Sequence, residues 1–189
     1  MIQPAEYIPQ YALSYYKRQA YLAWTGAVSV VFLWVLLIVA APVLFENGFG
    51  STALPIYHFF GYICHQLPER SLHLEGHQLA VCSRCFGVYF GLLAGLAVYP
   101  LWRRIEETEP LPRIWLFLSL IPIGIDWSLG VFGIWANTHL SRFLTGLLLG
   151  VACATFIVPA LVEITRNLST KRMARKNRIV SRSLKVAKR

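Results

Sequence analysis

The residues best suited to chemistry are concentrated in one short part of this 189-residue chain, between Cys64 and Cys85. Three of the four cysteines and three of the five histidines lie there. Their order along the chain is Cys64, His65, His73, His77, Cys82 and Cys85. Because thiolates and imidazoles are the ligands that zinc prefers, and a Cys-x-x-Cys pair is a common zinc chelate, this pattern predicts a tetrahedral zinc site with three cysteines and one histidine.

Three histidines are candidates for the fourth ligand of this predicted site. We expect His77 to complete the set with Cys64, Cys82 and Cys85, and His73 is an alternative. His65 is less suitable, because it is adjacent to Cys64 and two adjacent residues rarely both reach one ion. It could instead orient one of the metal-binding side chains by a hydrogen bond.

The same cysteines allow two other interpretations. In the first, Cys82 and Cys85 lie at the beginning of a predicted helix, where the helix dipole and the neighbouring Arg84 favour a thiolate. The two cysteines could then form and exchange a disulfide, with Cys64 as the resolving thiol and a quinone as the oxidant. This layout is superficially similar to that of quinone-coupled enzymes such as the vitamin K epoxide reductase family. The third interpretation is a structural disulfide or zinc ion in a non-enzymatic scaffold or assembly protein.

The composition indicates that these residues sit on a membrane protein. The chain is 56% hydrophobic and 14% charged, against about 25% charged for an ordinary soluble domain. A bilayer needs about 20 apolar residues per crossing, and four stretches of that kind occur, at about 21–45, 80–102, 114–135 and 141–163. Since the runs are continuous rather than alternating, we expect an all-α integral membrane protein with four transmembrane helices.

The segments between and beyond these spans divide the chain into three parts. We expect an N-terminal segment at 1–20, a four-helix domain at 21–165 with an outer Cys/His loop at 46–79, and a tail at 166–189. Within the loop, the apolar stretch 52–64 is too short to span and contains a proline, so it predicts a short interfacial helix before the second span.

Lysine and arginine are distributed unevenly over these parts. Basic residues precede the first span, separate the second from the third, and number ten in the tail, which has no acidic residue. The positive-inside rule therefore places both termini in the cytoplasm and the cysteines outside, in a multi-pass protein of the plasma membrane. The tail is expected to bind anionic lipid headgroups, and nucleic acid is the less favoured partner.

Two charged residues are predicted to lie within the membrane. Asp126 falls in the third span and Arg142 at the outer start of the fourth, so we expect them to pair and to line an outer-leaflet cavity below the cysteines. Tyr89, on the same helix face as Cys82 and Cys85, is expected to reach this cavity. These three are the candidate catalytic residues.

Glycines recur at a spacing of four residues on two of the predicted spans. Gly87, Gly91 and Gly95 lie on the second, and Gly146 and Gly150 on the fourth. Such stripes let helices approach closely. We expect close helix packing here, and the first stripe is also a possible homodimer contact.

Two blocks of the sequence resemble the signature of the membrane proteins called domain of unknown function 2085. The first block has these matching residues: Cys64-His65-Gln66, Pro68, Arg70-Ser71, Cys82-x-Arg84-Cys85, Gly87-x-Tyr89 and Gly91. The second has Asp126, Arg142-x-x-Thr145-Gly146 and Gly150. The resemblance covers about residues 57–151 and implies a prokaryotic polytopic membrane protein whose two blocks form one site.

The sequence thus favours a zinc-like site at the outer face, above a polar pocket that could accept a lipid or isoprenoid. The thiol–quinone oxidoreductase and the scaffold protein remain alternatives, and whether the protein is an enzyme is left open.

Overall fold

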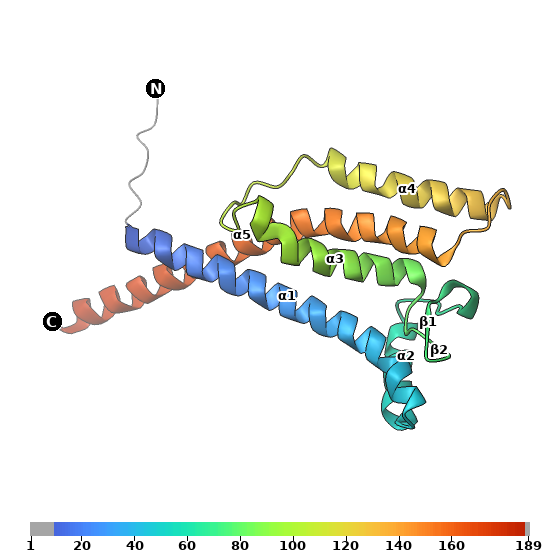
Figure 1. Ribbon diagram of the computed structural model, residues 1–189. Coiled ribbons are helices and arrows are strands. Elements are labelled where there is room, and N and C mark those ends of the chain that lie inside the picture. Colours follow the sequence, from blue (N-terminus) through green and yellow to red (C-terminus); the bar gives the residue numbers. More distant parts are fainter. Residues whose placement is uncertain (1–9, 188–189) are drawn as a thin grey trace.

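The computed structural model describes residues 10–187 as a mostly helical chain (Figure 1). The long helices are α1 (Gln10–Glu46), α3 (Ser83–Trp102), α4 (Ile114–Val131) and α5 (His139–Ala187). Between α1 and α3 lie the short helix α2 (Gly50–Gly61), the 3-10 turn η1 (Pro68–Arg70) and the strands β1 (His73–Leu74) and β2 (His77–Gln78). Residues 1–9 and 188–189, the ends of the predicted terminal segments, lie outside the described residues.

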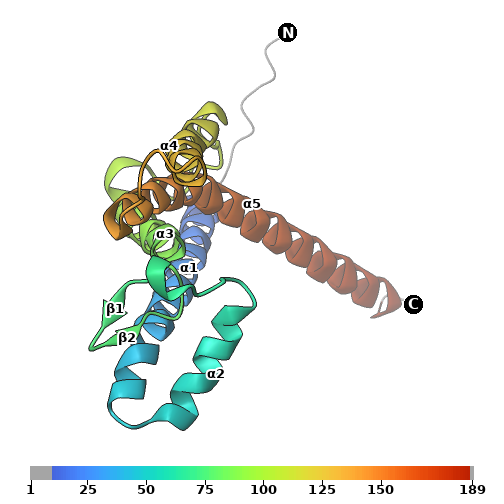
Figure 2. The same ribbon diagram turned by 90° about the vertical axis from the view of Figure 1, so that its right-hand side faces the viewer.

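Four of these helices are long and apolar enough to cross a membrane. The candidate spans are Ser14–Glu46, Ser83–Trp102, Ile114–Val131 and His139–Lys171, which confirms the number and order of the predicted spans. The first and last are longer than expected, because α1 already begins at Gln10 and α5 continues through most of the basic tail. The beginning of α1 and the end of α5 lie far from α2 and the strands, which gather at the other end of α1 (Figures 1 and 2).

The closest helix pair is α3 with α5. An added Cβ at Gly87 or Gly91 of α3 would collide with the α5 backbone at Phe143 or Leu147. Likewise, a Cβ at Gly150 of α5 would collide with the carbonyl oxygen of Val88. The predicted close packing is therefore confirmed, within one chain. Within the chain, α5 covers the glycine stripe of α3, and a homodimer contact through this stripe stays a prediction.

Two glycines end helices where the chain must turn at the cysteine end of the bundle. After α1, Gly48 has φ +80°, its N–H donates to Phe45 O at 3.1 Å, and the next N–H donates to Leu44 O at 2.9 Å. Gly133 (φ +67°) ends α4 with the same pair of bonds. This Schellman arrangement needs a left-handed residue, which glycine adopts without strain. The first turn leads α1 directly into α2.

The connection from α2 to α3 contains a small antiparallel hairpin, which the all-α prediction did not include. His73 pairs with Gln78, and Leu74 with His77. The two residues between the strands, Glu75 and Gly76, both have positive φ (51° and 79°). Two positive-φ residues are the requirement of a type I′ hairpin turn. The hairpin is too short to give a strong alternating pattern, and only its Glu-Gly pair marks it in the sequence.

The close contact between α3 and α5 can be tested by adding one methyl group at a glycine of this contact. Gly150→Ala is expected to destabilise the protein by about 1–3 kcal/mol or more, because the opposing atoms are backbone and cannot move aside. Gly26→Ala in α1, where a Cβ meets no atom within 4 Å, is the control and is expected to be neutral or stabilising by up to about 1 kcal/mol. Unfolding in detergent by increasing SDS measures both. Equal effects of the two substitutions would show that α3 and α5 are not in close contact.

Candidate metal centre

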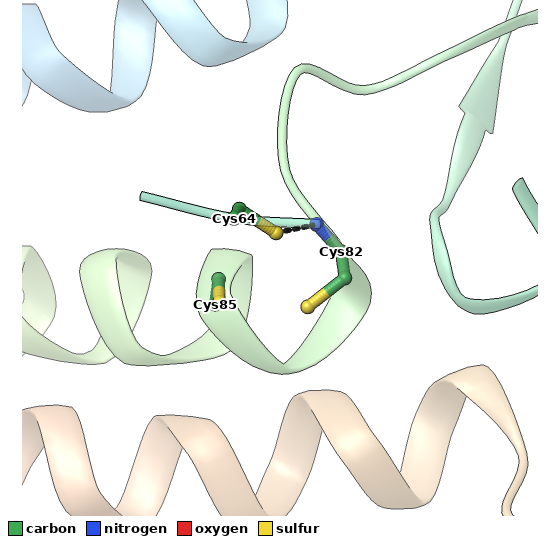
Figure 3. Close-up of side chains that lie close together, drawn as sticks. All are labelled: Cys64, Cys82 and Cys85. Carbon is green, nitrogen blue, oxygen red and sulfur yellow. Dashed lines mark hydrogen bonds between the residues drawn. The ribbon is translucent and has the colours of Figure 1, made fainter. Parts of the chain in front are cut away.

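Three cysteines from two parts of the chain converge at the beginning of α3. Cys64 follows α2, Cys82 is the N-cap residue of α3, and Cys85 lies in its first turn (Figure 3). Their sulfur atoms all lie within 4.8 Å of one another. The three thiols predicted as ligands are thus brought together, at a separation that one metal ion can bridge. Cys153, half-buried along α5, is not part of the group.

Backbone and amide hydrogen bonds hold the Cys64 loop against α3. The Cys82 N–H donates to the Cys64 sulfur at 3.2 Å. The Gln66 amide donates to the carbonyl oxygens of Tyr57 and Ala80, each at 2.7 Å, and so joins α2 to the residues before α3. Gln66 has φ +49°, a conformation that is uncommon for a residue with a side chain. The sequence did not identify Gln66 as a positioning residue, although it lies within the Cys-His-Gln motif.

Electrostatics make Cys64 the best candidate for a thiolate. The pKa of the Cys64 thiol is lowered, because the side chains of Cys82 and Cys85 and the backbone N–H of Cys82 donate hydrogen bonds to its sulfur. Burial of the Cys64 side chain acts in the opposite direction, and the hydrogen bonds outweigh it. Since the thiolate is the metal ligand and the nucleophile, the site favours both kinds of thiol chemistry.

The histidines are placed differently from the cysteines. His77, expected as the fourth ligand, lies on β2 with its Nε2 2.9 Å from Glu46 Oε2 at the end of α1, and its ring packs on Phe45. Among residues 10–187, neither His77 nor the alternatives His65 and His73 joins the three thiols. The hairpin register accounts for His77, because it directs this side chain toward α1.

The intramembrane acid also has a different partner from the one expected. Asp126 is buried in α4 and forms an ion pair with Arg84, which lies between Cys82 and Cys85 on α3. The predicted partner, Arg142, is half-buried, and its Nε has no hydrogen-bond partner among the described atoms. Asp126 is therefore linked to the thiol site through α3, and the expected Asp126–Arg142 pair is replaced by Asp126–Arg84.

A cavity of about 340 Å³ lies beside the thiols. Its lining includes Cys82, Cys85 and the arginines of three elements: Arg70 of η1, Arg84 of α3 and Arg142 of α5. A cavity next to the cysteines is thus present and Arg142 lines it as expected, but Asp126 is not part of its lining. Tyr89 does not line it; its ring packs edge-on against Trp34 of α1 at 5.9 Å. Tyr89 therefore lies on the apolar, α1-facing side of the site.

One further polar contact joins the two central helices at this end. The hydroxyl of Ser83, fully buried, lies 2.9 Å from His139 Nδ1 at the beginning of α5. Neither residue was predicted from the sequence to have a role. Only their positions in the sequence, with Ser83 directly after Cys82 and His139 shortly before Arg142, could have indicated that they lie near the site.

The Asp126–Arg84 pair can be tested by removing one charge at a time. Asp126→Asn leaves the partly buried Arg84 without its counter-ion and is expected to cost roughly 3–5 kcal/mol of unfolding free energy. Adding Arg84→Gln should recover part of this loss. Glu163→Gln, an exposed acid on α5, is the matched control and should change little. Additive losses in the double variant, measured in SDS titrations, would show that the two side chains do not interact.

The sequence is similar to one family of membrane proteins and to two archaeal proteins. The family described as "Predicted membrane protein (DUF2085)" matches residues 64–156, a range that begins at Cys64 and includes Cys85, Asp126 and Arg142. An uncharacterised protein of Methanocaldococcus jannaschii is 36% identical over 120 residues, which are 63% of this chain and 76% of that protein. An uncharacterised protein of Methanothermobacter thermautotrophicus is 36% identical over 95 residues, 50% of this chain and 84% of that protein.

No solved structure matches this chain. The family match covers both motif blocks, the one around the thiols and the one from Asp126 to Gly150, and the four apolar helices agree with a membrane protein. The chain belongs to the DUF2085 family of membrane proteins.

Proposed function

We propose that this membrane protein binds a zinc ion through Cys64, Cys82 and Cys85 and uses the site on a ligand in the adjoining polar cavity. The observation that carries the proposal is the convergence of three thiols within 4.8 Å. Cys64 comes from a separate loop, and backbone and Gln66 amide hydrogen bonds hold that loop in place. A preorganised set of three soft ligands fits zinc better than magnesium or calcium, which take oxygen ligands.

The fourth ligand is expected to come from outside the described side chains. Zinc takes four ligands, and among residues 10–187 only the three cysteines are grouped. Three protein ligands with one open position are typical of catalytic zinc sites, whereas structural sites are closed. When bound, zinc supplies a Lewis acid that polarises an oxygen ligand or lowers the pKa of water. Cys82 and Cys85 line the cavity, so a cavity ligand would lie next to this position.

We place the thiol end of the bundle on the outer side of the membrane. The opposite end holds Lys17, Arg103, Arg104 and Arg113 in or beside connecting segments, together with the continuation of α5. Basic residues in short loops are retained in the cytoplasm. At the thiol end, Arg84 and Arg142 lie on helices and only Arg70 lies in the connection between α2 and α3, so the connecting segments of the opposite end hold more basic residues.

Thiol–disulfide exchange is the second candidate, favoured by the lowered pKa of Cys64 beside two further thiols. In that reaction two thiols would lose two electrons and two protons to form a disulfide, and a quinone would take them up to become a hydroquinone. All four cysteines are free thiols in the structure. The two candidates differ in whether the purified protein contains a metal.

Metal content separates these functions. Protein purified in a non-ionic detergent is expected to contain about one zinc per chain by mass spectrometry, and Cys82→Ser should lose most of it, because two thiols bind zinc far more weakly than three. Cys153→Ser, which removes a thiol outside the group, is the matched control and should retain the metal. Circular dichroism on each sample verifies that the helices are intact. A metal-free wild type that forms a disulfide with added quinone would contradict the zinc proposal and support the exchange reaction.

A further inference from the structure

The cavity beside the thiols carries an excess of positive charge. Arg70, Arg84 and Arg142 line it, and Arg84 is paired with Asp126. Among the described residues, neither Arg70 nor Arg142 takes part in an ion pair. Three guanidinium groups and one carboxylate leave a net charge of +2. Three thiolates with a divalent metal would add −1, so the site remains positive in either state.

Part of this positive charge is removed from water without a partner. The Nε atoms of Arg84 and Arg142 are both buried and have no hydrogen-bond partner among the described atoms. Leaving such a donor unsatisfied is unfavourable, and more so where the group is charged. Two such unpaired donors, on arginines that line one cavity, indicate that the cavity is suited to an anion.

The geometry of the donors restricts the kind of anion. A guanidinium group presents a planar set of N–H donors that matches the oxygens of phosphate or carboxylate groups in pairs. Guanidinium groups from three different elements surround the cavity, which suits a group with oxygens in several directions, such as phosphate. At about 340 Å³ the cavity is near the lower limit of ligand pockets, about 300–1,000 Å³. It has room for a headgroup, and any longer part of the ligand must extend outside.

A path for such an extension lies next to the cavity. A second hollow of about 430 Å³ lies between α4 and the beginning of α5, lined mainly by apolar residues that include Pro122, Ile125 and Leu129. Asp126 belongs to its lining and pairs with Arg84 of the charged cavity, so this ion pair lies between the two hollows. Of the four spans, α4 is the least buried within the protein, and its apolar side chains are therefore expected to contact lipid chains.

We propose that Arg70, Arg84 and Arg142 form a binding site for a phosphate group, of the kind carried by a membrane lipid whose chain lies along α4. The inference concerns the same site as the proposed function and names the class of ligand for it. It depends on the arginines and not on the metal, so each can fail without the other.

Binding of labelled farnesyl phosphate to the detergent-purified full chain tests the site. The wild type is expected to bind it saturably, and farnesol, which has the same chain without the anion, should not compete. Arg142→Gln and Arg70→Gln should each weaken binding about tenfold or more, since each removes a charge-assisted contact. Arg142→Lys should lose less than Arg142→Gln, because it keeps the charge but not the fork of donors. Arg104→Gln, an exposed arginine at the opposite end of the bundle, is the matched control.

Competition with inorganic phosphate identifies the source of the anion. Displacement only by farnesyl phosphate would assign the site to a lipid headgroup, and equal displacement by inorganic phosphate would assign it to a soluble phosphate; both support an anion site. Competition by farnesol, or unchanged affinity in both Arg70→Gln and Arg142→Gln, would overturn the inference. Zinc measured on the same samples keeps the proposals distinct: binding without zinc refutes only the metal site, and zinc without binding refutes only the phosphate site.

Discussion

The contact between α3 and α5 is the constraint on which the site depends. Glycines on both helices bring the two backbones so close that a Cβ at Gly87, Gly91 or Gly150 would overlap the backbone of the other helix. Helix association in a bilayer relies on packing, because lipid chains are as apolar as the side chains they would replace. The close approach fixes Cys82, Cys85 and Arg84 of α3 relative to the beginning of α5. The Cys64 loop and α4 then pack against this fixed pair.

Because of this helix contact, the three thiols and the charged side chains lie next to one another at one end of the bundle. Arg84 lies between two of the cysteines and pairs with Asp126 of α4, so the first turn of α3 connects the thiol site with the acid on α4. Charges are expensive near a bilayer and are kept when they pair or bind. Asp126 forms an ion pair with only one of the three arginines around the cavity, and the remaining positive charge is the reason for which we propose a phosphate ligand.

The sequence predicted those parts of the structure that follow from local pattern. Continuous apolar runs marked all four spans, and the glycine spacing marked the close helix contact. The cysteine spacing identified three thiols that do converge. The position of the His77 side chain could not be predicted, because its direction depends on the register of a short hairpin, His73–Gln78, whose turn is formed by Glu75 and Gly76. The partner of Asp126 depended on which side of α3 faces α4, and hydropathy does not contain that information.

The central claim is that three cysteines bind zinc with one position left for a ligand from the cavity. X-ray absorption at the zinc edge of the purified protein measures the ligand set directly. We expect three sulfur neighbours at about 2.3 Å and one oxygen or nitrogen neighbour at about 2.0–2.2 Å. A spectrum with four sulfur neighbours, or with oxygen and nitrogen alone, would contradict the claim, because it would require ligands other than Cys64, Cys82 and Cys85.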